Sequence, residues 1–341
     1  MKIKKLLLIF FFLIFASLAH ALTFKVASYN VENLFDMTKS GTEYPDYIPD
    51  GSCGWTRHML DIKLDNVTKV IKDLKADIIA LQEIESEKAL VLLQKRLKKK
   101  GLFYPYYAIA DSRATAVKCA LLSKFPIVDK KDIPAGKKAD RNILKVTLDV
   151  DGNPFILFVN HWKSKSAPES RRVEYAKSLK KNIDKLDEDA DFVLTGDFNS
   201  NYNEFETFKK SRKFNNTKGV TGINHILMTV KDSKMVDEKL LTGQSSNKYL
   251  YNLWLEIKKK RRWSNNFYGR KGSLDNIIVS KGLYDDSGIL YVDNSFDKFD
   301  PDYLFLNRAL FRWQRDRRGK GKHLGAGYSD HLPVYAFFRT N

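Results

Sequence analysis

The chain has 341 residues, of which 43% are hydrophobic, and this apolar content supports a large folded core. Its 59 lysines and arginines outnumber its 41 acidic residues, which favours a polyanionic partner such as nucleic acid, an anionic membrane or another phosphate-rich surface. The alternative is a basic surface that only keeps the protein in solution. Two cysteines, Cys53 and Cys119, exclude a thiolate metal site and a Cys/His catalytic pair, although they leave one disulfide open.

The first residues predict a leader segment. Three lysines among the first five residues precede an apolar stretch over 6–16, and Ala19-His20-Ala21 is an A-x-A cleavage pattern. We therefore expect residues 1–21 to be a cleaved signal peptide, residues 22–341 to be a single domain, and the protein to be exported to the periplasm or the extracellular space. Loss of the three leader lysines leaves 56 basic residues and a net charge of +15. An uncleaved membrane anchor is the alternative; no later segment predicts stable membrane insertion, and we expect a monomer.

Hydrophobic periodicity predicts alternating strands and helices along the rest of the chain. The expected elements are strands 23–30, 78–81, 116–122, 143–150, 154–160, 274–280 and 333–338, and helices 60–74, 88–100 and 169–186. Asp151-Gly152 is a strong hairpin turn between two of these strands. Because strict strand–helix alternation is absent, the pattern favours an α/β (α+β) fold with mixed or antiparallel sheets covered by helices.

The most informative stretch is Thr195-Gly196-Asp197-Phe198-Asn199, which follows the apolar run 192–194. Side chains two residues apart on an extended backbone point the same way, so Asp197 and Asn199 project together beyond the strand end. An anionic oxygen beside a carboxamide suits a water molecule held next to a phosphoryl oxygen. Alone, the pattern also describes many turns.

Two further strand ends carry oxygen ligands. Asn30 ends the first strand, and Glu83 directly follows the apolar strand 78–81. A carboxylate at such a place is costly unless it is paired or bound to a metal. Oxygen ligands favour Mg²⁺, with Mn²⁺ or Ca²⁺ as alternatives. The competing interpretations are a capping residue for Asn30 and a structural ion pair for Glu83.

Two histidines also follow or precede strands. His161 lies at the end of the strand over 154–160, and Lys163 follows it. It can donate to a phosphoryl oxygen or protonate a leaving group near neutral pH, although a packed histidine is the commoner case. Asp330-His331 precedes the final strand, and Asp275 is the best candidate partner for the His331 imidazole.

These clusters, in this order, resemble the endonuclease/exonuclease/phosphatase superfamily, which includes pancreatic deoxyribonuclease and the abasic-site endonucleases. Gly-Asp-Phe-Asn at 196–199 and Ser-Asp-His at 329–331 are its most specific parts, and 120–127 resembles the family's strand-and-turn element. The resemblance runs from Ser28 to the final strand. It implies a four-layer sandwich of two packed β-sheets flanked by helices, with the site at one end of the sheets.

The resemblance also implies roles. Asn30 and Glu83 would help to bind the metal, and Asp330 would aid the metal or the water. Asp197 would position or deprotonate the attacking water, and Asn199 would support the phosphoryl group.

For the histidines, the resemblance implies that Asp275 orients His331, which contacts the scissile phosphate or transfers a proton. His161 favours the deoxyribonucleases, sphingomyelinases and inositol phosphatases over the abasic-site endonucleases. Lys118 stands near the place where the deoxyribonuclease pattern has a glutamate that supports this histidine, so the strength of His161 as an acid is open.

Basic and aromatic residues interleave before the Asp275 and Asp330 elements, over 254–271 and 312–322, which suits phosphate tracking and base stacking. Arg141, Arg172 and Lys163 are further candidates for substrate binding, with surface ion pairs as an equal explanation for the two arginines.

The sequence as a whole favours an exported, metal-dependent phosphodiesterase that hydrolyses nucleic acid, most of all a DNA endonuclease, with RNA as a second substrate. The alternatives are a sphingomyelinase-type phospholipase C, which would need an exposed apolar loop for membrane contact, and a polyanion-binding protein without turnover. An inositol-phosphate phosphatase is disfavoured because the family's Trp-x-Gly-Asp pattern is absent at the matching place.

Overall fold

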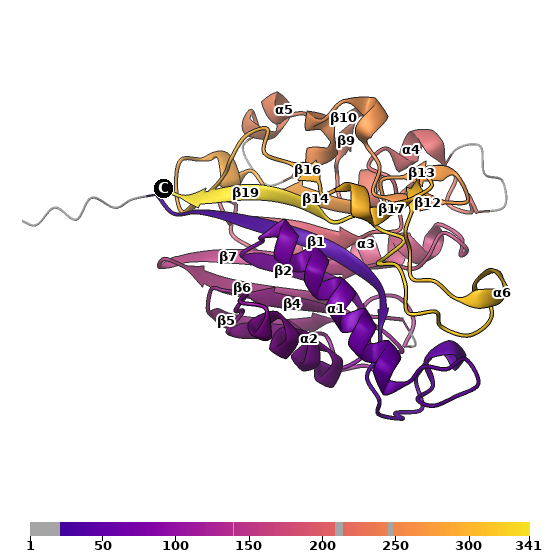
Figure 1. The fold of residues 1–341 in the computed structure, drawn as a ribbon. Coiled ribbons are helices and arrows are strands. Elements are labelled where there is room, and N and C mark those ends of the chain that lie inside the picture. The colour runs from indigo at the N-terminus through magenta and orange to yellow at the C-terminus, as the bar shows by residue number, and fades with distance from the viewer. Residues whose placement is uncertain (1–20, 139, 209–213, 245–247) are drawn as a thin grey trace, which may run out of the picture.

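The structure is a computed structural model that describes residues 21–138, 140–208, 214–244 and 248–341 (Figure 1). Apart from Ala21, the predicted signal peptide lies outside the described residues, so its cleavage stays a prediction.

Two large sheets form the centre of the molecule. The first contains, in spatial order, β15 (Ile289–Tyr291), β19 (Val334–Thr340), β1 (Thr23–Leu34), β2 (Ile78–Ile84), β4 (Lys118–Ser123) and β3 (Tyr106–Ile109), with β16 (Asp297–Lys298) also paired to β19. The second contains β11 (Tyr251–Asn252), β14 (Asp275–Val279), β8 (Phe192–Asp197), β7 (Asn153–His161), β6 (Ile143–Val150) and β5 (Ile127–Ile133). Both sheets are mixed, because β1 and β2 are parallel, as are β7 and β8, and the other pairs are antiparallel.

Helices and short hairpins complete the fold. The α-helices are α1 (Arg57–Leu74), α2 (Glu87–Lys99), α3 (Ser170–Ile183), α4 (Glu204–Thr207), α5 (Glu238–Thr242) and α6 (Asp316–Gly319), and η2 (Gly222–Ile226) is a π-helical turn. Short 3₁₀ turns are η1 (Pro45–Tyr47), η3 (Leu253–Glu256), η4 (Lys259–Arg261), η5 (Gly282–Tyr284) and η6 (Asp302–Leu304). Three two-stranded ribbons pair β9 (Val230–Lys231) with β10 (Lys234–Met235), β12 (Asn265–Phe267) with β13 (Arg270–Gly272), and β17 (Phe305–Leu306) with β18 (Ala309–Leu310).

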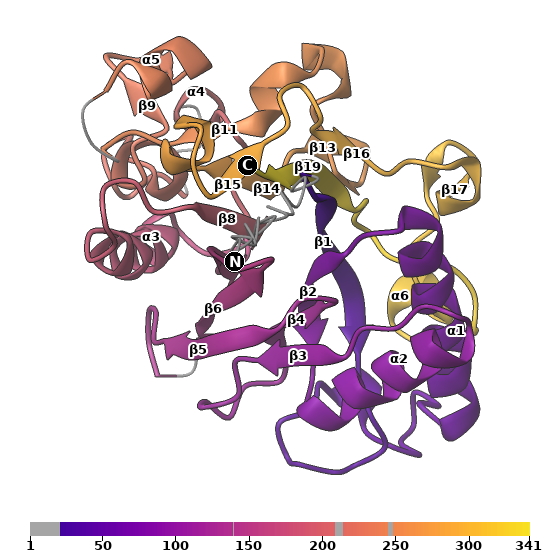
Figure 2. The same cartoon turned by 90° about the vertical axis from the view of Figure 1, so that its left-hand side faces the viewer.

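Four layers result, and the two-residue periodicity of the strands explains them. Along β1, Phe24 and Val26 enter the core between the two sheets, whereas Ala27 and Tyr29 enter the core beneath α1 and α2. A third core lies between the second sheet and α3 with η2. Figure 2 shows α1 and α2 on one side of the sheets and α3 on the other. The expected four-layer sandwich is confirmed.

Local sequence also explains the helix positions. The Thr56 hydroxyl accepts a hydrogen bond from the Met59 amide at the start of α1, and Ser86 caps α2 through the Ala89 amide. The apolar face of α1, which includes Leu60 and Leu64, packs on the first sheet.

The sequence missed the short strands β11, β15 and β16, the strands of the small ribbons, and the longer strands β3 and β5, which lie at sheet edges. Most residues of β5 are exposed and four of its seven positions are charged, and β3 begins with an exposed tyrosine. Edge strands often carry such polar positions, which erase the hydrophobic pattern that identifies inner strands. The disulfide left open by the sequence is not formed, since Cys53 and Cys119 are both free thiols. Within the described ranges, no helix has the length and apolar character needed to cross a membrane.

The close approach of β7 and β8 generates a test of the fold. Gly196 has φ +126°, and a Cβ placed there would lie 2.1 Å from the Asn160 carbonyl oxygen. Gly196→Ala should therefore lower the free energy of unfolding by at least about 2 kcal/mol in urea denaturation. Gly152→Ala is the control, because Gly152 also has positive φ but has open space around its Cβ position. Equal losses in the two variants would contradict the argument.

Candidate active site

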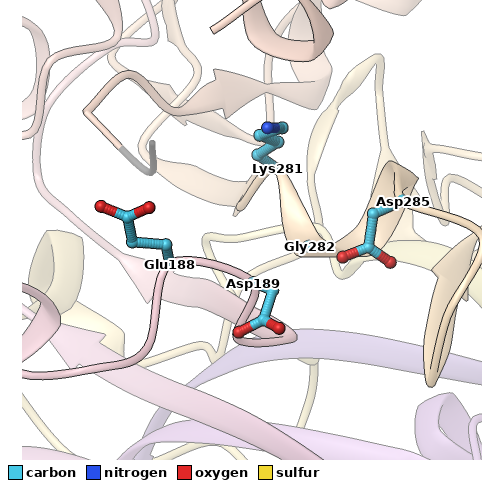
Figure 3. Close-up of a pocket in the computed structure, with 5 residues that line it drawn as sticks. All are labelled: Glu188, Asp189, Lys281, Gly282 and Asp285. Carbon is cyan, nitrogen blue, oxygen red and sulfur yellow. The ribbon is translucent and has the colours of Figure 1, made fainter. Parts of the chain in front are cut away.

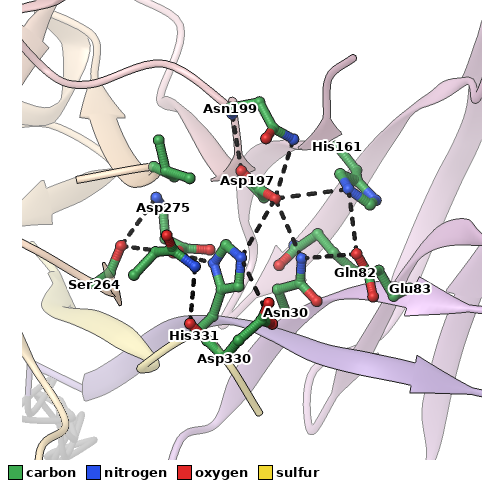
Figure 4. A network of polar contacts seen from close by, with 12 residues as sticks. Asn30, Gln82, Glu83, His161, Asp197, Asn199, Ser264, Asp275, Asp330 and His331 are labelled. Carbon is green, nitrogen blue, oxygen red and sulfur yellow. Dashed lines mark hydrogen bonds and ion pairs between the residues drawn. The ribbon is translucent and has the colours of Figure 1, made fainter. Parts of the chain in front are cut away.

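The candidate site exists because strand direction brings residues of β1, β2, β7, β8 and β14 to one end of the sandwich, where Asp330 and His331 also lie. β1 and β2 run parallel, with Asn30 opposite Gln82, so Glu83 emerges beside Asn30. β7 and β8 also run parallel, with His161 opposite Asp197. β14 is antiparallel to β8, and its first residue, Asp275, lies opposite Asp197. Figure 4 shows these side chains pointing toward one another.

Asp197 is the centre of this group. It is 2% exposed, and its Oδ1 accepts the backbone amide of Asn199 at 2.8 Å. Its Oδ2 accepts the side-chain amides of Asn30 and Asn199, each at 3.2 Å. Burial raises the pKa of Asp197 to about 7, against the opposing effect of the positive charge on His331. A carboxyl group with such a pKa can accept a proton near neutral pH.

Asn199 is held in a left-handed conformation, with φ 48°. Its amide also donates to the Trp162 carbonyl at 3.0 Å, which fixes the side chain against the end of β7. The carboxylate and carboxamide expected to project together therefore do so through a direct hydrogen bond.

His331 forms the expected pair with Asp275. Its Nδ1 lies 2.7 Å from Asp275 Oδ2, and the same oxygen accepts the Ser264 hydroxyl at 2.6 Å. Burial alone would lower the pKa of His331, but the carboxylates of Asp275 and Asp197 raise it well above the ordinary value. The His331 Nε2 atom then carries a proton and lies 4.0 Å from Asp197 Oδ2.

His161 has the opposite electrostatic environment. Its Nε2 lies 3.6 Å from Asp197 Oδ2 and 3.7 Å from Glu83 Oε1, whereas its buried Nδ1 has no hydrogen-bond partner among the described residues. Burial, together with the charges of Arg141 and His331, lowers its pKa well below the ordinary value. His161 is therefore neutral at pH 7, and hydrogen bonding suits it better than the protonation of a leaving group that the sequence allowed.

The absence of a partner for His161 Nδ1 among the described residues agrees with the presence of Lys118 on β4, a strand of the other sheet. Lys118 does not face the histidine; its ammonium donates to the backbone carbonyls of Glu85 and Thr115. The sequence had placed this lysine near the position of a supporting glutamate, and the structure gives it a structural role instead.

Glu83 and Asn30 lie together, but the Asn30 amide has a different orientation from the expected one. Asn30 Nδ2 donates to Glu83 Oε1 at 3.3 Å, while Oδ1 accepts the Glu32 amide at 3.0 Å. In this arrangement the Asn30 side-chain nitrogen donates to the carboxylates of Glu83 and Asp197. The Asn30 side-chain oxygen would face a cation only if the amide were rotated. Glu83 itself has φ 67°, a strained backbone conformation for a residue other than glycine.

The side chains present fit a hard divalent cation. Burial raises the pKa of Glu83, and the nearby Asp330 carboxylate raises it further. Asp330 also lies 3.9 Å from His331 Nε2, at the same end of the sandwich. Carboxylates that are buried close to one another are stabilised when a cation balances their negative charge. Glu83 and Asp330 are therefore the residues that would hold such a cation.

A second candidate group of ligands consists of Asp197, Asp275 and His331, whose ligand atoms lie within 4.8 Å of one another. The hydrogen bond between Asp275 and His331 already occupies Asp275 Oδ2 and His331 Nδ1. This bond favours an acid–base pair over a metal centre at that place, with Asp197 between the pair and the Glu83 carboxylate.

The predicted substrate-binding residues differ in whether a substrate can reach them. Arg141 is half-buried near the site, and it donates to the backbone carbonyls of His161 and Trp162 at 3.1 and 2.9 Å. The side chain of Lys163 remains 44% exposed and lies 3.8 Å from Asp140. Both can face an anionic ligand at the rim of the site.

Arg172 corrects the sequence interpretation. It is fully buried, pairs with Glu169 at 2.7 Å, and donates to the Ser164 carbonyl at 3.0 Å. A side chain that is enclosed by α3 and the loop after β7 is out of reach of a substrate. Arg172 instead orders the loop that follows His161.

The basic stretches are also less available than the sequence indicated. Arg261 pairs with Asp297 at 3.0 Å, and Arg262 donates to the Ile257 and Leu255 carbonyls. In the later stretch, Arg315 pairs with Asp46. These arginines are used within the fold, so any contact with a polyanion depends on the remaining exposed cations.

The sequence missed a second charged cluster beside the site. Arg312 donates to Glu32 and lies 3.7 Å from Asp330, while the buried Lys63 donates to the Tyr328 carbonyl at 2.8 Å. Lys63 follows Leu60 by three residues on the apolar face of α1, and this misplaced charge was the available indication. Ser264, which holds Asp275, had no such pattern around it.

A separate hollow lies away from this group. Figure 3 shows Glu188, Asp189, Lys281, Gly282 and Asp285 around it. These residues precede β8 and follow β14, so the hollow is at the opposite end of the strands from Asp197. Its three carboxylate residues are exposed. Solvated carboxylates do not provide the convergent, buried donors of the candidate site.

Comparison with known proteins agrees with the family resemblance of the sequence and with the observed fold. A model of the endonuclease/exonuclease/phosphatase family matches residues 25–237 and 231–340. Humanized TDP2 from D. rerio has a TM-score of 0.57 and 14% identity, over 93% of this chain and 99% of that one. An AP endonuclease from Archaeoglobus fulgidus has a TM-score of 0.56 and 14% identity, over 92% and 98% of the two chains.

A family protein from Bacteroides thetaiotaomicron has a TM-score of 0.51 and 16% identity, over 94% of this chain and 99% of that one. At these identities the structures show a shared fold. No curated protein matches the sequence. The match of the family model to nearly the whole described chain has the stronger consequence: the protein belongs to the endonuclease/exonuclease/phosphatase family.

Proposed function

We propose that this family member is an exported, metal-dependent phosphodiesterase that hydrolyses nucleic acid, with DNA cut internally as its main reaction. The observation that carries the proposal is the convergence on buried Asp197 of two amide donors and two histidines with opposite pKa shifts. That set can accept a proton from water and place donors around a phosphoryl group.

The protonation state of each residue determines its role in the proposed reaction. Asp197, with a pKa of about 7, takes a proton from the attacking water. Protonated His331 donates from Nε2 to a phosphoryl oxygen or the leaving oxygen, while Asp275 holds the imidazole by Nδ1. Neutral His161 adds a donor where negative charge grows, and Asn199 holds Asp197 in place through its backbone and side-chain amides. A bound Mg²⁺ at Glu83 and Asp330 would offset the phosphate charge and stabilise the leaving oxygen.

Three observations favour a nucleic acid as the substrate. The net charge of the mature chain is +15 on the counts above, which draws polyanions. Lys163 leaves an exposed cation beside His161. One structure of the same fold, D. rerio TDP2, is described as a complex with single-strand DNA product, with a TM-score of 0.56 and 14% identity. The leader supports export.

The first test compares substrates directly. Purified protein with Mg²⁺ should nick supercoiled plasmid and should lose that activity in a chelator, because Glu83 and Asp330 then lack the cation. Raising the salt concentration should weaken cleavage steeply, since released counterions drive binding to phosphates. Agarose gel electrophoresis gives the readout. Release of phosphocholine from sphingomyelin liposomes without plasmid nicking would favour the phospholipase, and neither activity would favour a binding protein.

The second test removes the central groups. Asp197→Ala and His331→Ala should each lower kcat on plasmid by about 1000-fold, because each deletes a group that acts on the developing charge. Thermal melting should show that both variants stay folded. His58→Ala is the matched control, because His58 is exposed on α1 away from this group. Turnover by either site variant at the rate of the His58 control would refute the assignment.

The third test uses the His331–Asp275 pair in metal-free protein. Because the folded-state pKa of His331 is raised, the stability that this pair contributes is fully present below about pH 6.5 and is lost as the pH rises through the raised value. Asp275→Asn should therefore destabilise the protein more at pH 6 than at alkaline pH, and imidazole NMR should show a lower His331 pKa. The control is Asp285→Asn, an exposed carboxyl at the opposite end. A His331 pKa that is unchanged in Asp275→Asn would contradict the pairing.

A further inference from the structure

An aromatic hairpin tip lies within the basic and aromatic stretch over 254–271, and the site described above assigns it no contact. In the ribbon of β12 and β13, Phe267 pairs with Arg270, which leaves Tyr268 and Gly269 as a two-residue turn. Phe267 is 59% exposed and Tyr268 is 88% exposed. The two rings contact each other edge to face, with centroids 4.6 Å apart.

The turn chemistry makes Tyr268 conspicuous. Its φ is 49° and that of Gly269 is 81°, the pattern of a type I′ turn. Asparagine, aspartate or glycine is normally found at the first of these positions, because a larger side chain disfavours the left-handed conformation. The chain therefore places a bulky, solvent-exposed ring where both turn geometry and solvation oppose it.

The ribbon is fixed to the catalytic residues at its base. Asn265 forms a backbone bridge with His331 and donates to the Asp330 carbonyl at 2.9 Å. Ser264, just before the ribbon, donates to Asp275. Tyr268 lies three residues beyond Asn265, and a strand rises about 3.3 Å per residue, so the tip is about 10 Å from this anchor. That reach fits a group close to the bond that is broken.

We propose that the tip of this ribbon, Phe267 and Tyr268, stacks on an unpaired base of a nucleic acid strand near the scissile phosphate. Arg270, which pairs with Phe267, and Lys271, whose ammonium lies 4.4 Å from the centroid of the Trp263 ring, are exposed on the same ribbon and supply its positive charge. Exposed aromatic rings beside cations are the combination that binds single-stranded nucleic acid, because every base has a face on which a ring can stack.

The same rings could contact a lipid surface, and the charges favour the nucleic acid. A membrane anchor draws on a broad apolar surface, whereas the tip offers two rings, one of them a phenol, with Arg270 paired to Phe267 across the ribbon. Attachment of the ribbon base to His331 and Asp275 also keeps the tip within about 10 Å of the catalytic residues. The inference rests on the proposed nucleic-acid substrate and names the subsite that holds its base.

The test uses a substitution that suits the turn. Tyr268→Asn places a favoured residue at this position and removes the ring, so its melting temperature should equal or exceed that of the wild type. In a chelator, its affinity for a dye-labelled single-stranded DNA oligonucleotide, measured by fluorescence anisotropy, should fall about tenfold. Tyr268→Phe should keep the wild-type affinity. Phe103→Ala, which removes an exposed ring before the strand β3, is the matched control and should also keep it.

An abasic oligonucleotide of the same length separates stacking from charge. It keeps the phosphates and lacks the bases, so Tyr268→Asn and wild type should bind it equally. Equal loss on both oligonucleotides, no loss on either, or a loss confined to phosphatidylserine-containing vesicles would each overturn the inference. Plasmid nicking by the wild type is scored separately. Nicking without any Tyr268 effect defeats this inference alone, whereas a base-dependent Tyr268 effect without nicking defeats only the proposed function.

Discussion

The site depends on the burial of one carboxylate between the ends of two sheets. Asp197 belongs to the second sheet, but one of its oxygens accepts a hydrogen bond from Asn30 of the first. An uncompensated buried carboxylate is costly, so the surrounding donors are needed to stabilise it. The donors it collects from both sheets are also the groups that a phosphoryl transfer requires. The packing of the two sheets against each other therefore also assembles the site.

Burial also gives two histidines different roles. Both lie close to Asp197, at 3.6 Å for His161 and 4.0 Å for His331, and both are nearly enclosed. Only His331 has a carboxylate on its second nitrogen, and that contact outweighs the effect of burial on its pKa. His161 has no such partner in the described parts of the chain, and its pKa falls. One buried environment thus supplies a charged donor and a neutral one.

How far the sequence could predict this arrangement follows from the range of the forces involved. Hydrophobic periodicity is local, so the inner strands and the three long helices were predictable, and the polar residues at strand ends followed from them. The edge strand β5 was not, because its charged positions erase the pattern. The Asp275–His331 pair was predicted only through chemical roles, since 56 residues separate the two side chains.

The errors have a common cause. Arg172 and Arg262 are cationic side chains of the kind that binds an anionic substrate. Each instead donates to backbone carbonyls of a loop, and those carbonyls would otherwise lack a hydrogen-bond partner. A sequence shows that a cation is present but not which carbonyls lie within its reach. Tyr268 is the converse case: its ring contacts the exposed Phe267 ring and is itself 88% exposed, so it is available to a ligand. Long cationic side chains near irregular loops should therefore first be tested as loop supports, and exposed rings in unfavourable turns as contacts.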